Sequence, residues 1–310
     1  MIVQGKEKEL VNALRKTLLT QATARSRREK EEIPAIIAER RKQLEAGFAE
    51  MNALHFDRSM SDDAFWYVAA TKPFYAGHVA AHVDARDGYM LTQYLGDREA
   101  LTSIEWSPGR KRYEEFLDDE GCFRHADNLS KVINAANQIS ASKVHNSYKT
   151  VIEFICRDIT DLNATVSLQS FHKRLNAVLQ YGEVTTFHVM TELGLPVVKP
   201  DRVVVRVAIA IGIIDSYKSG SKTYSLPKTV TSDEATDLGA IPAFNWALQE
   251  ACRRIADEAG ISMRLLDFLL VKLGQEPDDV NGFVRTICTE SNPTCQLCKV
   301  KPFCNHGSRR

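Results

Sequence analysis

Four cysteines close together near the end of the chain constrain its folding more than any other feature of the sequence. They follow the pattern Cys-x6-Cys-x2-Cys-x5-Cys, at Cys288, Cys295, Cys298 and Cys304. A zinc ribbon presents two Cys-x2-Cys pairs about 15–20 residues apart, whereas this segment has a single such pair. Four thiolates in one compact loop, stiffened by Pro293 and Pro302, suit the larger [4Fe–4S] cluster. We therefore expect a structural [4Fe–4S] cluster, and zinc, disulfides or free thiols stay open as alternatives.

The composition is that of an ordinary globular protein. The 310 residues are 44% hydrophobic and 26% charged, which allows a sizeable core and two domains. The formal net charge is zero, so any DNA-binding surface has to be a local patch. The N-terminal segment mixes acidic and basic side chains without a signal-peptide core, and the apolar run 203–214 is too short to span a bilayer. We expect a cytoplasmic monomer with no membrane partner.

Helical periodicity dominates the chain, and alternating strand patterns are scarce. Pro34 separates two helical patterns within residues 6–50, and Ser61 followed by Asp62 and Asp63 is typical of a helix start. Gly274 is expected to follow the last helix as a C-terminal cap. The run 203–214 would also fit a buried strand on periodicity alone. Further helical patterns cover residues 128–139, 147–157, 164–180, 243–256 and 263–273. The scarcity of strand patterns favours an all-α fold.

A second informative stretch runs from Leu179 to Val207. Asp201 is preceded by the turn Gly194-x-Pro196 at the end of a helical pattern and is followed by an apolar run. This arrangement resembles the helix-hairpin-helix signature of DNA glycosylases, and the "VVKPDR" run that ends at Arg202 is similar to the methyladenine-type branch. The cysteine spacing resembles the cluster loop of the endonuclease III class within the same superfamily.

The resemblance implies an all-α protein of two helical domains. Residues 59–196 would form the six-helix helix-hairpin-helix domain, and residues 1–58 would pack with the catalytic and cluster domain of residues 197–310. By the same resemblance Leu179 to Thr186 is the hairpin, Asp201 is the catalytic carboxylate, and the four cysteines ligate the [4Fe–4S] cluster. An alternative for Asp201 is that it only caps the helix beginning at Arg202.

The sequence departs from the family in two places. The hairpin from Gln180 to His188 contains no lysine, so Schiff-base chemistry of the endonuclease III type is not expected. Lys72 and Ala80 stand where many methyladenine glycosylases have a pocket Glu and a Trp. We therefore expect a monofunctional enzyme whose pocket accepts a different base.

Such an enzyme flips a modified base out of double-stranded DNA and hydrolyses its N-glycosidic bond, leaving an abasic site. Base-excision repair of an alkylated or damaged base, near the nucleoid, is the expected role. Two alternatives are excision of a hypermodified base from phage DNA as a defence, and non-catalytic DNA binding by an iron–sulfur protein. A radical enzyme or redox carrier would also bind a cluster, but the radical Cys-x3-Cys-x2-Cys pattern is absent.

Candidate DNA and base contacts lie in three places. A loop around Pro73 presents aromatic side chains and one cation, which suit a pocket for an extruded base. For Trp66, the aromatic residue in the preceding helix, the alternative is a place in the core. The hairpin and the "VVKPDR" run supply further contacts, and two lysines beside the cysteines would meet phosphates. The candidates are Trp66, Lys72, Phe74, Tyr75, Tyr181, Gly182, Lys199, Lys299 and Lys301.

Overall fold

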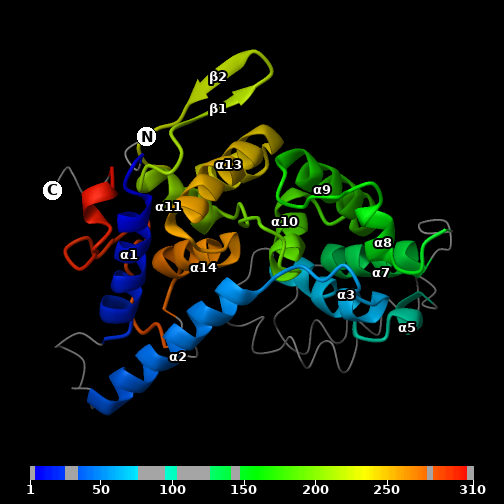
Figure 1. Ribbon diagram of the computed structural model, residues 1–310, viewed down its shortest axis with the longest axis horizontal. Helices are drawn as coiled ribbons and strands as arrows, with labels where there is room; N and C mark the ends of the chain where they lie inside the picture. Colours follow the sequence, from blue (N-terminus) through cyan, green and yellow to red (C-terminus); the bar gives the residue numbers. More distant parts are fainter. Residues whose placement is uncertain are drawn as a thin grey trace. The chain divides into compact units, whose positions relative to one another are not determined.

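The computed structural model describes residues 4–24, 34–75, 95–102, 126–140, 147–277 and 282–305. Two compact units divide the chain: residues Met1–His55 with Pro196–Arg310 form unit 1, and Phe56–Leu195 form unit 2 (Figure 1). The described parts are mostly helical, as expected, and no helix among them is long and apolar enough to cross a membrane.

Unit 1 is built from helices drawn from both ends of the chain. Its core is made of the apolar faces of these helices. The elements are α1 (Glu7–Thr17), a π-helical turn (Leu18–Ala22), α2 (Pro34–Ala53), α11 (Arg202–Ala210), β1 (Ser216–Ser219), β2 (Lys222–Ser225), α12 (Ser232–Gly239), α13 (Pro242–Ala259), α14 (Met263–Gly274) and a 3₁₀ turn (Lys301–Phe303). Helix α14 lies at the centre, because it packs against α1, α2, α11 and α13.

Helix α11 occupies the apolar run for which a strand was an alternative, and the strand alternative is wrong. Asp201 starts the helix by accepting hydrogen bonds from the backbone N–H groups of Val203 and Val204. Helix α11 ends at a left-handed Gly212, where the Ile213 N–H bonds the carbonyl of Ala208 at 2.9 Å. The local cap chemistry at both ends therefore decides between two structures that hydrophobicity alone does not separate.

Gly274 does not cap α14 as expected. It is the last residue of the helix, and Gln275 takes the capping position with an extended backbone. A Cβ atom at Gly274 would lie 2.5 Å from Cγ2 of Val207 and 2.9 Å from Cγ1 of Val203. The glycine is needed because α11 and α14 approach each other closely at this point.

Unit 2 contains α3 (Asp62–Ala69), a 3₁₀ turn (Lys72–Tyr75), α5 (Arg98–Thr102), α7 (Ala126–Ser140), α8 (Val151–Cys156), α9 (Thr165–Leu179) and α10 (Glu183–Glu192). The start of α3 confirms the sequence prediction, since the Ser61 side chain accepts from the Ala64 N–H. Asp62 Oδ1 accepts from the Val151 N–H at 2.7 Å and so ties α3 to α8. Ala80 lies outside the described residues.

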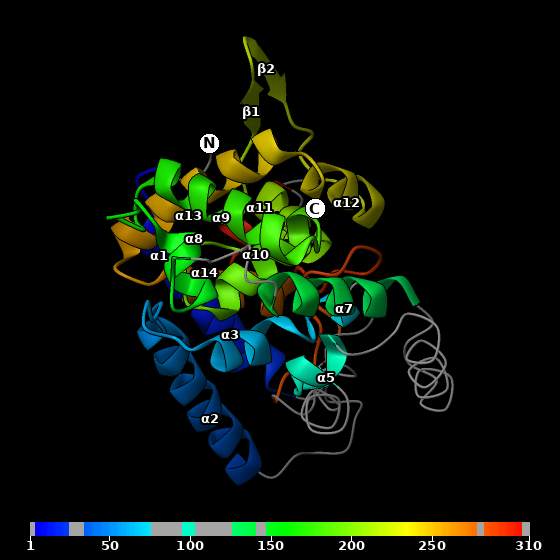
Figure 2. The ribbon, with the colours of Figure 1, turned by 90° about the vertical axis from the view of Figure 1, so that its right-hand side faces the viewer.

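Within the described residues, a two-stranded antiparallel hairpin, β1–β2, departs from the all-helical expectation. Tyr217 pairs with Tyr224 across the hairpin, and Ser219 pairs with Lys222. The turn contains Gly220, whose φ of 60° is left-handed. Figures 1 and 2 both show the hairpin extending away from α11 and α13 of unit 1.

Candidate functional site

Asp201 lies at the N-terminus of α11, and both oxygens of its carboxylate have partners. Oδ1 accepts from the backbone N–H groups of Val203 and Val204, each at 2.9 Å. Oδ2 lies 3.0 Å from Nζ of Lys199. The side chain of Asp201 keeps 22% of its surface exposed, so a solvent-borne group can still reach the carboxylate. The two cap hydrogen bonds fix the orientation of the carboxylate.

The segment that leads into Asp201 is held by two buried polar side chains of unit 1. Gln249 of α13 makes a reciprocal pair with Val198, accepting its N–H at 2.8 Å and donating to its carbonyl at 2.9 Å. Asp267 of α14 accepts the Lys199 N–H at 2.7 Å. These contacts fix the backbone immediately before the candidate carboxylate.

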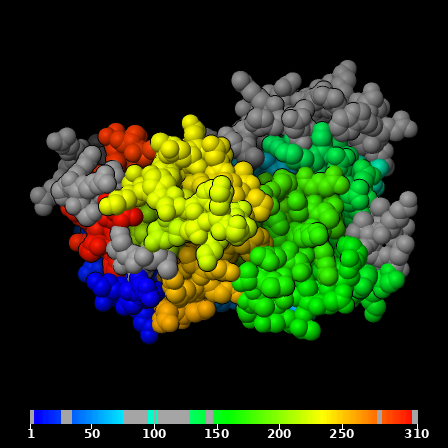
Figure 3. All heavy atoms as spheres, turned by 90° about the horizontal axis from the view of Figure 1, so that it is seen from above, coloured from blue at the N-terminus to red at the C-terminus, as the bar shows by residue number. Residues whose placement is uncertain are grey.

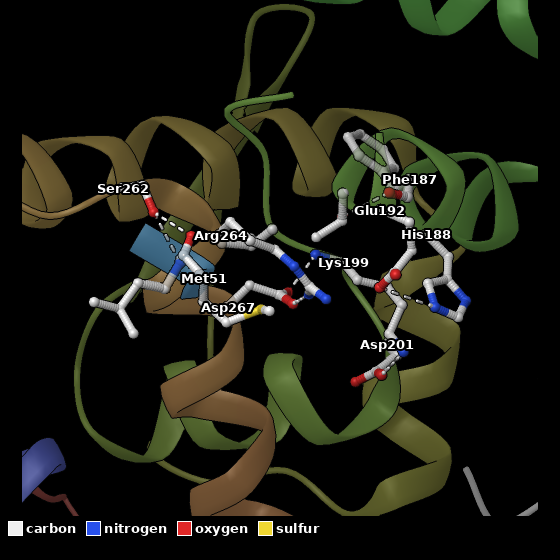
Figure 4. Close-up of polar contacts among 12 residues, drawn as sticks. Met51, Phe187, His188, Glu192, Lys199, Asp201, Ser262, Arg264 and Asp267 are labelled. Atoms are coloured by element: carbon white, nitrogen blue, oxygen red, sulfur yellow. Dashed lines mark hydrogen bonds and ion pairs between the residues drawn. The ribbon is translucent and has the colours of Figure 1, made fainter. Parts of the chain in front are cut away.

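Asp267 also faces a cation. Its Oδ2 lies 3.0 Å from Nη1 of Arg264, and the carboxyl group is almost completely buried (Figure 4). Burial raises the pKa of Asp267 to about 6, although Arg264 and Lys199 oppose the shift and the nearby charge of Asp201 adds to it. We name the four residues Lys199, Asp201, Arg264 and Asp267 the carboxylate cluster.

Asp267 and Gln249 were not among the sequence candidates. A signal for Asp267 was present, because this acidic residue interrupts an apolar helical pattern between Leu266 and Phe268. A charged residue on the buried face of a helix usually has a partner. The identity of that partner depends on packing between segments far apart in the chain, which the sequence pattern does not give.

The expected hairpin region forms a tight connection between α9 and α10 in unit 2. Gln180 has a φ of 56° and Gly182 a φ of 87°, both left-handed. A Cβ at Gly182 would meet nothing within 4 Å, so the backbone conformation rather than crowding requires glycine there. Gly182 is exposed and precedes the N-terminus of α10, whose first N–H groups lack partners within the helix. Tyr181 is buried, and burial raises the pKa of its hydroxyl.

The candidate base loop is largely inside unit 2. Trp66 is completely buried and donates from Nε1 to the Leu95 carbonyl at 2.6 Å, and Phe74 is also buried. These two residues pack the core and present no face to an extruded base. Lys72 is buried as well, with Nζ 5.0 Å from the centre of the Tyr75 ring. Tyr75 is the partly exposed member of the loop.

The cysteine loop is attached to three helices of unit 1. The Cys288 N–H bonds the Leu273 carbonyl of α14 at 2.9 Å. The Lys299 N–H bonds Oγ1 of Thr17 in α1 at 3.0 Å, and the Asn305 N–H bonds the Ala210 carbonyl of α11 at 2.7 Å. The 3₁₀ turn buries Phe303. A loop with little regular structure is thereby fixed by its backbone.

The four cysteines line one cavity, which is partly open to solvent. Ile211, Leu273 and Ile287 supply apolar walls, and Lys301 lies at the cavity while Lys299 is exposed. Burial raises the pKa of Cys288 to about 11 and that of Cys298 to about 12. Such thiols would lose their protons only to a strong stabilising charge, which bound metal provides.

The four cysteines form a donor set of the kind that binds soft metals. Among the described residues, no group of three or more His, Cys, Asp or Glu side chains has the geometry for one metal ion. All four thiols are free, and they face the same apolar cavity. Four soft ligands around one cavity are compatible with an iron–sulfur cluster and also with zinc.

No protein-family model, curated protein or solved structure matches the chain. In unit 1 the structure brings Lys199 together with Asp201, and it gathers the four cysteines. Gly182 and Tyr181 lie together in unit 2, as do Lys72, Phe74 and Tyr75.

Proposed function

We propose that the protein is a monofunctional DNA glycosylase that flips a modified base from duplex DNA and hydrolyses its N-glycosidic bond. The observation that carries the proposal is the geometry of Asp201, whose carboxylate is oriented by a helix N-terminus and remains partly exposed. The tight α9–α10 connection and the cysteine loop support it, because both agree with the motifs that suggested the class.

Cleavage of an N-glycosidic bond develops positive charge on the sugar. A carboxylate held beside the sugar C1′ stabilises that charge and orients the attacking water, and removing such a preorganised group typically costs about 2.7–4 kcal/mol of barrier. Oδ1 of Asp201 is committed to two N–H groups, so Oδ2 is the oxygen that would face the sugar. Lys199 at 3.0 Å would move from Oδ2 toward a DNA phosphate as the substrate enters.

The α9–α10 connection would hold the DNA backbone. The N–H groups at a helix N-terminus bind phosphate without reading sequence, and exposed Gly182 lets a phosphate approach closely. Tyr75, the partly exposed aromatic residue of the Pro73 loop, is the remaining candidate there for stacking on the base. The base would be alkylated or otherwise modified.

Cys288, Cys295, Cys298 and Cys304 would hold a [4Fe–4S] cluster. When bound, the cluster would supply structural cross-links rather than chemistry on the base. The loop's own contacts to α1, α11 and α14 would then hold Lys299 and Lys301 at fixed positions, where they can meet phosphates.

One observation favours a second candidate function, a non-catalytic DNA-binding protein. The cap and the Lys199 ion pair together occupy both oxygens of Asp201, as they would in a purely structural residue. In that case Asp201 would stabilise α11, and DNA binding would not lead to base release.

Mass spectrometry of bases released from a panel of alkylated, deaminated and phage-modified duplexes tests the proposal. We expect one class of base to be released by the wild type, and Asp201→Asn to slow release by about 10²–10³-fold while binding the same DNA. Asp237→Asn, a change on an exposed residue of α12, is the matched control and should keep full activity. Release from no duplex in the panel, with DNA binding intact, would support the non-catalytic alternative, and full activity of Asp201→Asn would remove the proposed mechanism.

A further inference from the structure

The β1–β2 hairpin is a highly exposed element of unit 1. Every residue from Lys218 to Ser225 is exposed, and Tyr224 keeps 42% of its surface accessible. Figure 3 looks onto this hairpin and shows its yellow atoms standing outward from unit 1. An isolated two-stranded hairpin is marginally stable in water, so its presence here needs an explanation in contacts at its base.

The base of the hairpin is anchored to α13 and to the core. Tyr217 packs edge-on against Phe244 of α13, with ring centres 5.7 Å apart, and stacks on Tyr224 at 5.1 Å. The Leu226 N–H bonds the Asp215 carbonyl at 2.7 Å, which closes the open end. These contacts hold the strands in place while leaving the outer half free of packing.

The charge of the hairpin differs from that of the whole chain. Residues 216–232 contain Lys218, Lys222 and Lys228 and no acidic residue, whereas the chain as a whole has equal numbers of acidic and basic side chains. The remaining exposed side chains of the two strands are mostly hydroxyls, which donate hydrogen bonds to phosphate oxygens. A projecting element with only positive charge complements a polyanion.

The segment after the hairpin is also tied to the cysteine loop. Ser232, at the start of α12, donates through its backbone N–H to Oε2 of Glu290 at 3.0 Å, and its hydroxyl makes a second hydrogen bond to the same oxygen. Glu290 lies in the interval between Cys288 and Cys295. The exposed lysines of the hairpin and Lys299 of the loop are thus carried by connected parts of one unit.

We propose that the β1–β2 hairpin is a second DNA contact, which binds the phosphate backbone of duplex DNA through Lys218 and Lys222. The inference rests on the proposed function only in taking DNA as the polyanion. The hairpin would add affinity without sequence preference, since phosphate contacts carry no base information. It would let the protein bind undamaged duplex outside the site around Asp201.

An added strand from a protein partner is the other occupant that an open hairpin suits. Lysines on exposed strands, however, are a usual means of preventing edge-to-edge pairing, and both strands carry one. The two lysines therefore argue against a strand partner and for phosphate.

The test measures the affinity of the full-length protein for an undamaged duplex between about 0.05 and 0.2 M salt. The paired change Lys218→Glu with Lys222→Glu should weaken binding most at low salt. The slope of log K against log salt should become shallower by about 2, because each lost lysine removes about one released counterion. Lys218→Ala with Lys222→Ala should give the same change of slope without added repulsion, which separates lost contacts from repulsion by new carboxylates.

Lys8→Glu is the matched control, because Lys8 is exposed on α1 of the same unit and stands between two glutamates. It should leave the slope unchanged. An unchanged slope and affinity in the alanine pair would overturn the inference, as would an equal effect of Lys8→Glu. Base release is a separate measurement, so a protein that releases no base yet loses affinity in the hairpin variants would contradict the proposed enzyme and support the hairpin contact.

Discussion

The carboxylate cluster and the cysteine loop both contact α11, and they are held in place by different means. The cluster sits at the N-terminus of α11 and is organised by charged side chains, with Asp267 bonded to the Lys199 N–H across 68 residues of sequence. The loop reaches the C-terminal end of α11 and is attached through backbone hydrogen bonds of Asn305, Lys299 and Cys288. One site depends on long-range packing, and the other on a short segment that carries all its candidate ligands.

This difference predicts how each site responds to mutation. In the cysteine loop the bound group, rather than the polypeptide, should provide most of the stabilising free energy, since the loop has little regular structure. In the carboxylate cluster the polypeptide itself provides the stabilisation. The loss of stability on substitution should therefore be larger for the more deeply buried side chains.

Cys298→Ser should remove essentially all bound iron and sulfide. A group bound at a thousandfold excess over its dissociation constant stabilises the folded state by about 4.1 kcal/mol, and the loss should appear as a large drop in thermal midpoint. Iron and sulfide analysis with calorimetry measures both. Cys156→Ala, a buried cysteine of unit 2, is the control and should keep the wild-type iron content. Stoichiometric zinc without sulfide in anaerobically purified wild type would refute the iron–sulfur cluster.

Asp267→Ala should lower the free energy of unfolding by about 3–5 kcal/mol, the usual effect of removing one partner of a buried ion pair. The change removes the carboxylate 3.0 Å from Arg264 and the acceptor of the Lys199 N–H. Asp267→Asn keeps an acceptor for the Lys199 N–H, so its free energy of unfolding should fall by less than that of Asp267→Ala. Denaturant unfolding compares the two variants, and equal losses would mean that the N–H contact contributes little.

The pH dependence of stability should carry a signature of Asp267. Its pKa is raised from an ordinary 3.8 to about 6 in the folded protein, so between these values the folded state binds more protons than the unfolded state. The contribution of protonated Asp267 to the free energy of unfolding is present in full below about pH 4. It is lost as the pH rises through 6, which lowers the free energy of unfolding by about 3 kcal/mol. Asp267→Asn should flatten the free energy of unfolding over this range, and an unchanged profile in that variant would assign the dependence to another group.

The smallest effect concerns the role of Asp201 as a helix cap. Asp201→Ala should destabilise the fold by about 0.5–2 kcal/mol through loss of the two cap hydrogen bonds. Asp201→Asn keeps a good cap, so its free energy of unfolding should stay within a few tenths of a kcal/mol of the wild-type value. Unfolding by urea measures both variants. If Asn stops base release without this loss of stability, the carboxylate has a role beyond capping.

The parts of the molecule that sequence predicts well are those set by neighbouring residues. Ser61 was recognised as a helix start, and capping was the alternative role for Asp201, because a cap is a local hydrogen bond. The helical class followed from periodicity. Gly274 was misinterpreted, since its role depends on the close approach of Val207 from another helix. The β1–β2 hairpin was missed because each strand has four residues and most of these are polar, so the strand pattern carries little signal.

The candidate site divides in the same way. The spacing marked the four cysteines as candidate ligands, and the structure places them around one cavity; the cluster itself stays a prediction. Trp66 and Phe74 were proposed as base contacts from their place beside a predicted loop, and the structure buries both. Asp267 and Gln249 were missed, because only the packing of α13 and α14 against the segment before Asp201 gives them their partners.

The division of unit 1 into two separate stretches of sequence has a consequence for synthesis on the ribosome. Helix α1 emerges early with Leu10 and Leu14 on its apolar face, but its partners α13 and α14 belong to the far end of the chain. At about 5–20 residues per second, the intervening unit 2 alone takes roughly seven to thirty seconds to translate. Unit 2 can fold during this interval, while the apolar face of α1 stays uncovered until α13 and α14 have been synthesised. A polar substitution at Leu14 should therefore reduce the yield of folded protein, and a chaperone that shields α1 should raise that yield in the wild type.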